Sequence, residues 1–195
     1  QTTINGTSSG QPTLNAVEAF GGEPTFDGLT INGPPPGGNS IPITGVRFTG
    51  LLQGKLLHCR VFTHPEGGGT IQASTITGVE ANGGELILDG TEVKLPPMAN
   101  ATVKRAVYLC GANVMLRDSK ITATLDDTTG GAAVEALDDG TTCTGGAKNN
   151  FNAFRSVVVS VGGTNKSAVS IDWPRNARDD KMIEFQRSVV RASAA

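Results

Sequence analysis

The sequence predicts an all-β chain that winds into a parallel β-solenoid, a stack of coils built from short strands. The first observation is a six-residue word that starts at residues 26, 56, 88, 116 and 154. The second is its spacing of 28 to 38 residues, because self-similarity at such a period marks repeat architectures. The third is composition: glycine contributes 26 of 195 residues and only 17% are charged, below the roughly 25% usual in soluble domains.

The five copies of the word share one positional pattern. Each begins and ends on a large apolar residue and has a small or apolar fourth residue: FDGLTI (26–31), LLHCRV (56–61), LDGTEV (88–93), LRDSKI (116–121) and FRSVVV (154–159). Stacked coils lie about 4.8 Å apart and place each residue over its counterpart, so they require a shared pattern. An immunoglobulin-like sandwich is the rival architecture, but its strands need no common pattern.

Further strands are expected between the words. Segments with a roughly alternating apolar pattern lie at 43–48, 70–73, 103–109 and 132–137, and clusters of turn-forming residues separate them. Two or three short strands per period, without a helical stripe, complete one coil. The repeat therefore predicts five to six coils over residues 20–173.

The two ends depart from the repeat. Residues 1–19 are polar and are predicted to be an arm that is flexible or ordered only against a partner. Residues 167–173 can form one more strand. Residues 174–195 are predicted to be a non-repeating C-terminal cap or a subunit-contact tail. The cap would be a hairpin or a short amphipathic helix with Asp179 as its N-cap. A distinct terminal unit is expected because the last coil exposes its core and its strand edges.

Aligning the words predicts columns of charged side chains. The fifth positions are Thr30, Arg60, Glu92, Lys120 and Val158, and the second positions are Asp27, Leu57, Asp89, Arg117 and Arg155. Arg60, Glu92 and Lys120 would then form a ladder of alternating sign, and Asp89 would lie beside Arg117. Opposite charges on neighbouring strands contribute a fraction of a kcal/mol each, so these residues have a structural use.

The three cysteines lack the CxxC spacing of a zinc site, and their number does not indicate a disulfide framework. Cys59 occupies the fourth position of its word and is predicted to be a small buried apolar residue. A disulfide between Cys110 and Cys143 is left open.

The words LDGTEV and LRDSKI, with their partners, resemble those of the right-handed parallel β-helix proteins, the pectin-lyase-like group, over roughly residues 24–161. This group includes polysaccharide lyases and hydrolases, phage tailspikes, other virion surface proteins and adhesins. Its enzymes use paired carboxylates, or an Arg or Lys base, on an outward face. Asp89, Arg117 and Asp118 are the nearest match here; the interpretation we favour is a solvated charge ladder. His58 lies in the same region but is a lone histidine.

The net charge, the length of the apolar runs and the absence of known motifs exclude several classes of function. A net charge of −2 lacks the positive excess that binding to nucleic acid or to an anionic membrane requires. No apolar run is long enough for a transmembrane helix. No motif indicates a cofactor or a metal.

We therefore expect a non-catalytic structural protein at a virion surface or in an extracellular location. A viral (phage) capsid-decoration or tail-associated protein fits best, forming a homotrimer whose partners are capsid or tail proteins. The alternatives are a tailspike-like β-helix that binds or cleaves a polysaccharide, and a secreted bacterial adhesin module.

Overall fold

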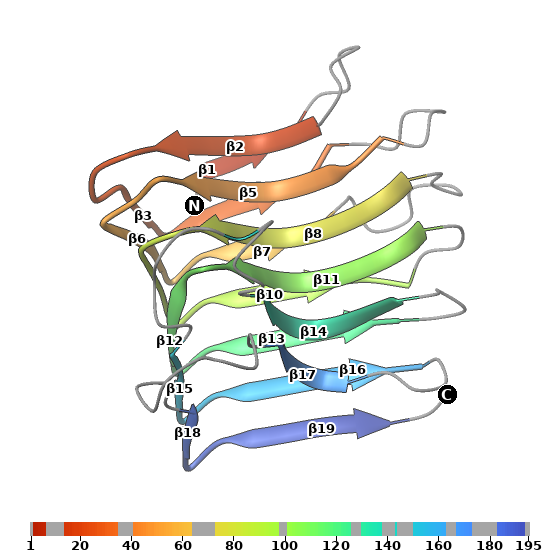
Figure 1. Ribbon diagram of the computed structural model, residues 1–195. Coiled ribbons are helices and arrows are strands. Elements are labelled where there is room, and N and C mark those ends of the chain that lie inside the picture. The colour runs from red at the N-terminus through yellow and green to blue at the C-terminus, as the bar shows by residue number, and fades with distance from the viewer. Residues whose placement is uncertain are drawn as a thin grey trace.

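The computed structural model describes residues 2–6, 14–34, 41–63, 73–97, 101–125, 130–137, 143, 150–162, 167–172 and 183–193. Within these ranges all regular elements are strands, and they form three stacked parallel sheets (Figure 1). The predicted all-β solenoid is confirmed. The immunoglobulin-like sandwich is excluded, because each strand pairs in parallel with the strand three places further along the chain.

The three sheets form three sides of the coil. Sheet A contains β1 (Thr2–Asn5), β4 (Leu29–Asn32), β7 (Arg60–Phe62), β10 (Glu92–Leu95), β13 (Lys120–Thr124), β16 (Val157–Val161) and β19 (Val189–Ser193). Sheet B contains β2 (Leu14–Phe20), β5 (Ile43–Thr49), β8 (Ala73–Asn82), β11 (Ala101–Cys110), β14 (Gly130–Leu137) and β17 (Ser167–Asp172). Sheet C contains β3 (Thr25–Asp27), β6 (Gln53–Leu57), β9 (Glu85–Asp89), β12 (Asn113–Arg117), β15 (Phe151–Phe154) and β18 (Ile183–Gln186).

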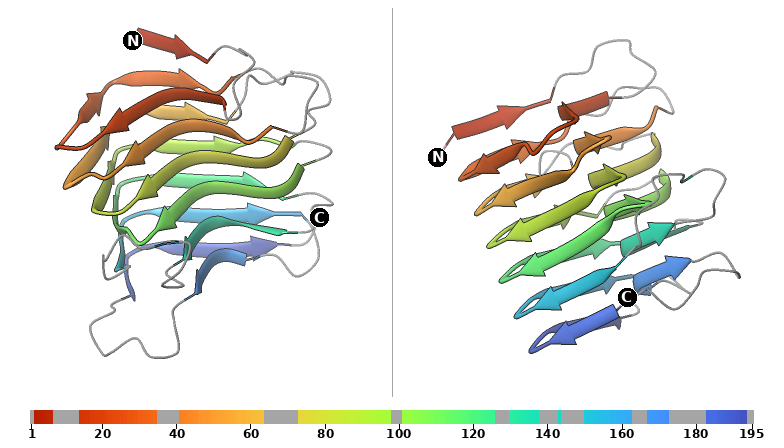
Figure 2. Two further views of the ribbon diagram at one scale, coloured as in Figure 1. Left: turned by 45° about the horizontal axis from the view of Figure 1, so that its top comes forward. Right: turned by 60° about the vertical axis from the view of Figure 1, so that its left-hand side comes forward.

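Each coil consists of one strand from sheet B, one from sheet C and one from sheet A, in that order. The described strands give six such coils, from β2–β3–β4 to β17–β18–β19, and the chain makes about five turns between β2 and β17. In Figure 1 the chain runs leftward along sheet B at the front and rightward along sheet A behind while it descends, so the coil is right-handed. Figure 2 shows from two further sides how regularly the coils stack.

Apolar columns fill the interior because alternate residues of each strand point inward. The valine column of sheet B (Val46, Val79, Val107 and Val134), the leucine column of sheet C (Leu56, Leu88 and Leu116) and the sheet A column (Ile31, Val61, Val93, Ile121 and Val158) are fully buried. Burying such a side chain stabilises a fold by about 1.5–3 kcal/mol relative to exposing it. These columns are the main source of stability.

The structure shows that each word is a corner between sheets C and A. The first four copies are in the predicted register, with Phe26, Leu56, Leu88 and Leu116 in one column. The predicted register of the fifth copy is wrong by one residue, since Leu116 pairs with Ala153 and not with Phe154. A slip of one residue exchanges the faces of a strand. Val157, not Val158, therefore continues the outward column of Lys120.

A sixth copy of the word lies at residues 185–190. Ala153 pairs with Phe185, and Val158 pairs with Val190. The last described coil thus continues the repeat.

Both ends are more regular than the sequence predicts. The predicted arm, residues 1–19, contains strand β1 and all but the last residue of β2, which pair with β4 and β5. They do so because Ile4 and Val17 extend apolar columns of the solenoid. At the other end β17 confirms the predicted strand as far as Asp172, while Trp173 lies outside the described residues.

The predicted helix near the C-terminus is wrong for residues 183–193, which form β18 and β19. Ile183 and Phe185 follow a period of two, as in a strand, and their neighbours pair in register with the preceding coil. Residues 174–182, including Asp179, lie outside the described part of the chain.

At the third position of each word the backbone turns through the left-handed region. The six residues have φ between 46° and 66°: Gly28, His58, Gly90, Asp118, Arg155 and Arg187. Side chains other than glycine rarely adopt this conformation, so surrounding contacts must hold it in place.

A ladder of inward-facing hydroxyl groups, buried at Thr91, Ser119 and Ser156, supplies those contacts. The N–H of Cys59 donates to Thr91 Oγ1 (3.3 Å), that of Thr91 to Ser119 Oγ (3.1 Å), and that of Ser119 to Ser156 Oγ (3.2 Å). The N–H of Ser156 donates in turn to Ser188 Oγ (3.1 Å). The hydroxyls donate back to carbonyls of the preceding coil, for example Ser119 Oγ to Leu88 O (3.0 Å). Each hydroxyl also lies within donating distance of the carbonyl two residues earlier in its own coil, as Ser119 Oγ does of Arg117 O (2.8 Å), so it serves backbone groups of two coils.

We expect Ser119→Ala to lower the free energy of unfolding by roughly 1–3 kcal/mol, because it leaves the buried N–H of Thr91 and the carbonyl of Leu88 without this partner. Chemical denaturation measures the loss. Ser119→Cys is the matched control, since Cys59 fills the equivalent position, and it should lose less. Equal losses for the two variants would contradict the hydroxyl's assigned role.

Candidate functional site

The structure brings the three predicted site residues together. Asp89 ends β9, Arg117 ends β12 in register with it, and Asp118 follows at the corner. All three line one groove on the outward face of sheet C. Their proximity follows from coil stacking, and a catalytic role for them belongs only to the alternative interpretation as an enzyme.

The groove has a volume of about 610 Å3 and runs across β12, β15 and β18. Residues that point away from the core make up its polar lining, because alternate residues of a strand face opposite sides. It is lined by Asp89, Met115, Leu116, Arg117, Asp118, Asn152, Ala153, Phe154, Arg155, Glu184 and Gln186.

Asp118 is held by a two-point salt bridge to Arg155 in the next coil. Arg155 Nε donates to Asp118 Oδ1 at 2.7 Å, and Nη2 donates to Oδ2 at 2.5 Å. The Arg155 guanidinium also lies over the ring of Phe154, 4.6 Å from its centroid. The pair therefore joins the corners of two coils and forms one wall of the groove.

The hydrogen bonds from Arg155 lower the pKa of the Asp118 carboxyl below its ordinary value. A general acid at neutral pH needs the opposite change, a raised pKa that keeps the proton on the carboxyl. Asp118 is therefore an ionised hydrogen-bond acceptor. Because its pKa is lowered in the folded state, its stabilising pairing is present above the pKa of the unfolded chain and is lost as pH falls through the folded value.

Sequence reasoning missed half of this groove. The predicted register puts Arg155 in the wrong column, and the predicted C-terminal cap includes Glu184 and Gln186. A signal for the correct register was present: Arg-Ser-Val-Val occurs at both 155–158 and 187–190. Aligning these two segments puts Ser156 and Ser188 at the hydroxyl position of the word.

The predicted charge ladder on sheet A is confirmed. Glu92 lies between Arg60 (Nε to Oε2, 3.7 Å) and Lys120 (Nζ to Oε1, 3.9 Å). These contacts are long and solvent-exposed, so each contributes at most about 1 kcal/mol. His58 has a similar arrangement, since its Nδ1 lies 3.0 Å from Asp27 Oδ1 in the preceding coil. It does not line the groove.

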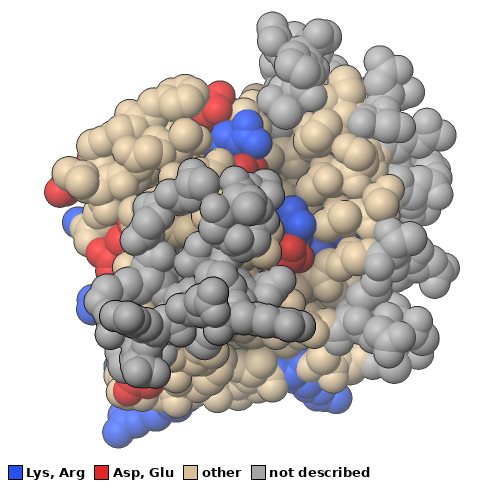
Figure 3. Space-filling model, in the orientation of Figure 1, with Lys and Arg blue, Asp and Glu red and all other residues tan. Residues whose placement is uncertain are grey.

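Sheet B carries a second set of ion pairs on its outward face, which the word alignment did not predict. Glu80 accepts from Arg47 Nη2 at 3.1 Å and from Asn82 Nδ2 at 2.9 Å. Arg105 pairs with Glu135 at 2.7 Å. Figure 3, which faces this sheet, shows basic and acidic groups close together on its described surface.

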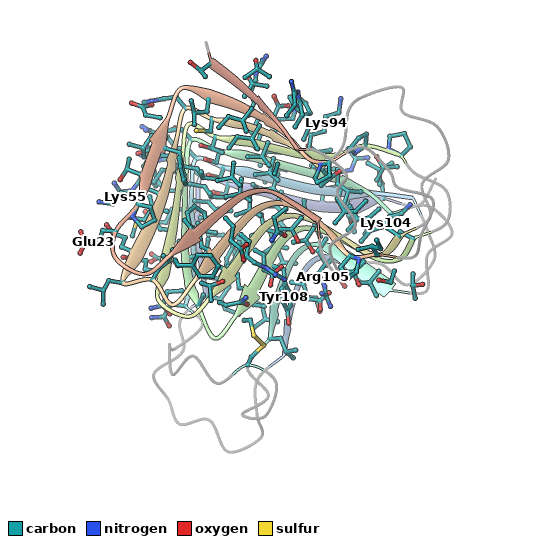
Figure 4. All side chains as sticks on the ribbon, turned by 90° about the horizontal axis from the view of Figure 1, so that it is seen from above. Glu23, Lys55, Lys94, Lys104, Arg105 and Tyr108 are labelled. Carbon is teal, nitrogen blue, oxygen red and sulfur yellow. A yellow bond between two sulfur atoms is a disulfide. The ribbon has the colours of Figure 1, made fainter. Side chains whose placement is uncertain are left out.

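Arg105 also packs on an aromatic ring. Its guanidinium lies 4.2 Å from the centroid of the Tyr108 ring, and Figure 4 shows the two side chains next to each other on sheet B. The two ion pairs connect neighbouring strands of this sheet, whereas Arg105 and Tyr108 both belong to β11.

The disulfide that the sequence left open is formed between Cys110 and Cys143. It ties residue 143 to the end of β11. Cys59 is fully buried and free, as predicted, and burial raises the pKa of its thiol. A thiol of this kind is poorly reactive because the thiolate is the nucleophile.

Within the described residues the structure has neither a cluster of metal-ligating side chains nor a membrane-spanning helix. No group of three or more His, Cys, Asp or Glu residues has an arrangement that would hold a metal ion there. Among the same residues, no helix has the length and apolar character to cross a membrane.

Replacing Arg155 by Gln should raise the pKa of the Asp118 carboxyl toward its ordinary value, because its main stabilising partner is lost. A carbon-13 NMR titration of the Asp side chains measures this change. Arg60→Gln is the control, since Arg60 is similarly exposed (58% against 53%) but belongs to sheet A. If the Asp118 pKa stays the same in Arg155→Gln, the salt bridge is not what lowers it.

Removing the Cys110–Cys143 disulfide should lower the free energy of unfolding by about 3–4 kcal/mol, the chain-entropy expectation for a loop of this length. The cysteines are 33 residues apart in sequence. Thermal unfolding of the double variant Cys110→Ser/Cys143→Ser, compared with that of the wild-type protein, measures this loss of stability. Adding a reductant should destabilise the wild-type protein and leave the double variant unchanged; destabilisation of both would point to another cause.

Comparison of the chain with models of protein families, with curated proteins and with solved structures found no match. The resemblance to pectin-lyase-like proteins thus extends to the β-solenoid architecture alone.

Proposed function

We propose that this protein is a non-catalytic structural protein of a virion surface or another extracellular surface, of the kind that decorates phage capsids or tails. The observation that carries the proposal is the salt bridge between Asp118 and Arg155. Asp118 belongs to the group of residues that most resembles a catalytic site. In the structure its carboxylate joins two coils. The lowered pKa of Asp118 suits this structural use and opposes proton donation.

The other charged residues fit the same interpretation. Arg60, Glu92 and Lys120 form a ladder along sheet A, and Glu80 and Glu135 pair with arginines on sheet B. Such pairs fix the lateral register of stacked strands. The disulfide supports an oxidising compartment, where such bonds form and persist.

The end of the solenoid supports assembly with other chains. Four large apolar residues of the last coil are 41–53% exposed: Ile183, Phe185, Val189 and Val190. Exposed apolar patches on soluble proteins commonly mark interaction sites. Capsid or tail proteins as partners, and a homotrimer as the assembly, stay predictions.

The proposed function predicts that the purified protein depolymerises no polysaccharide. Release of reducing ends, and ultraviolet absorbance for unsaturated products, would be measured over a panel of acidic and neutral polysaccharides. Saturable release that Asp118→Asn or Asp89→Asn abolishes would overturn the proposal. Release that both variants retain points to a contaminating enzyme, and repurification resolves it.

Glycan binding is a second candidate function, and the groove on sheet C favours it. Phe154 provides an apolar ring, and Asn152, Arg117 and Gln186 provide planar polar groups of the kind that bind hydroxyls. Three carboxylates face two guanidinium groups in the lining, which favours a neutral over an acidic glycan. Phe154→Ala should weaken binding at least tenfold in calorimetry, with Phe20→Ala on another surface as the control.

A further inference from the structure

The last described coil ends the stack with three strand edges that no other described strand covers. β17, β18 and β19 are each the terminal strand of their sheets in the described structure. An unpaired edge presents a row of N–H and C=O groups and acts as a template for another strand. In this molecule three such edges lie together around one end of the core, which is visible at the bottom of Figure 1.

The same end exposes a cross-section of the core. Ile183, Phe185 and Val190 continue inward columns, yet they are 44%, 43% and 41% exposed. Their counterparts one coil earlier, Phe151, Ala153 and Val158, are at most 3% exposed. A hollow of about 520 Å3 opens on this surface, lined by Ser167, Ala168, Val169, Ile171, Ile183, Phe185, Val190 and Ala192.

The two ends of the solenoid are not equivalent. At the N-terminal end β1 covers the edge of β4, and Ile31 of the first coil is fully buried. Val17 and Phe26, which lie on inward columns there, are half-buried. A chain stacking head to tail would meet β1 on sheet A and find less exposed apolar surface than the C-terminal end offers.

We propose that the C-terminal coil docks on the C-terminal coil of a second copy of this chain, tail to tail. The inference deepens the proposed assembly role and rests on it. Inside the molecule each coil buries its inward residues against another coil. The end of the C-terminal coil, with three strand edges around apolar columns, is therefore matched best by another coil end of the same kind. The copy supplies one, and its apolar columns cover the hollow between β17, β18 and β19.

Symmetry favours this arrangement over head-to-tail stacking. A twofold contact uses the same patch on both chains and closes, whereas head-to-tail contacts of a solenoid continue into filaments. The twofold axis reverses strand direction, so the edges pair in the antiparallel manner, which is at least as stable as parallel pairing. Glu184, Arg187 and Arg191 lie on this coil and supply both signs of charge for contacts across the junction.

Sedimentation equilibrium of the full chain tests the proposal. We expect an even number of chains per particle: two, or six where three solenoids also associate side by side. Phe185→Lys should raise the dissociation constant of the even-numbered contact at least tenfold, because it places a charge on the apolar surface. Phe20→Lys is the matched control: Phe20 is 71% exposed at a corner of the first coil, and its replacement should leave the assembly unchanged.

Hydrogen exchange identifies the end that is buried. In the wild-type protein the amides of β18 and β19 should be protected, and this protection should fall in Phe185→Lys while that of β8 and β11 is retained. If Phe185→Lys loses its β-sheet circular dichroism, Val190→Lys on the neighbouring sheet replaces it.

Several outcomes would overturn the tail-to-tail contact: a monomer, an odd number of chains, or an assembly that neither C-terminal variant weakens. Of these, a stable trimer without the tail-to-tail contact leaves the proposed structural function standing. Depolymerisation of a polysaccharide would remove that function whatever the number of chains.

Discussion

The structure depends on how the backbone is satisfied at the corner between sheets C and A. There the chain leaves one sheet, passes through a single left-handed residue and enters the next, so strand pairing alone does not serve all its polar groups. The inward hydroxyl of Thr91, Ser119, Ser156 or Ser188 accepts an N–H from the preceding coil and lies within donating distance of the carbonyl two residues earlier in its own coil. Because a buried polar group without a partner costs about 1–3 kcal/mol, this ladder fixes the register of every coil it passes through.

The same corner explains where the charged residues of the groove lie. Asp118 and Arg155 occupy the left-handed position, with φ of 47° and 46°, and that position turns their side chains away from the core. Stacking then brings consecutive corner residues within reach of each other. The salt bridge and the hydroxyl ladder are thus the outer and inner sides of one repeated turn.

Much of the fold was predictable from the sequence because stacking requires the same residue type at the same phase. Leu56, Leu88 and Leu116 show that phase plainly, and the alternation of Arg60, Glu92 and Lys120 followed from it. The register of the fifth copy was predicted wrongly because Val157–Val159 is a run of three valines without alternation. The word therefore fits the sequence equally well one residue too late. Ser156 carried the correct phase, but only the hydrogen bonds of the structure reveal why a serine belongs there.

The remaining differences have equally local causes. Ile183, Phe185, Val189 and Val190 fit a helical and a strand period over so short a segment, and pairing with the preceding coil decides for the strand. The groove was half predicted: Asp89 and Arg117 follow from the alignment, whereas Arg155 and Glu184 depend on the register that the alignment missed. The disulfide was beyond prediction because the spacing of two cysteines does not tell how a chain brings them together.

That disulfide has a mechanical consequence. From Cys110 the chain passes through β12, β13 and β14 and reaches Cys143 after one full circuit of the solenoid, so the bond closes a covalent ring around a single coil. A solenoid pulled from its two ends can unwind coil by coil, since each coil contacts only its neighbours. This ring does not open under such a load, and the extension of the chain would be shorter by the contour of 33 residues, or about 110 Å, until the bond is reduced.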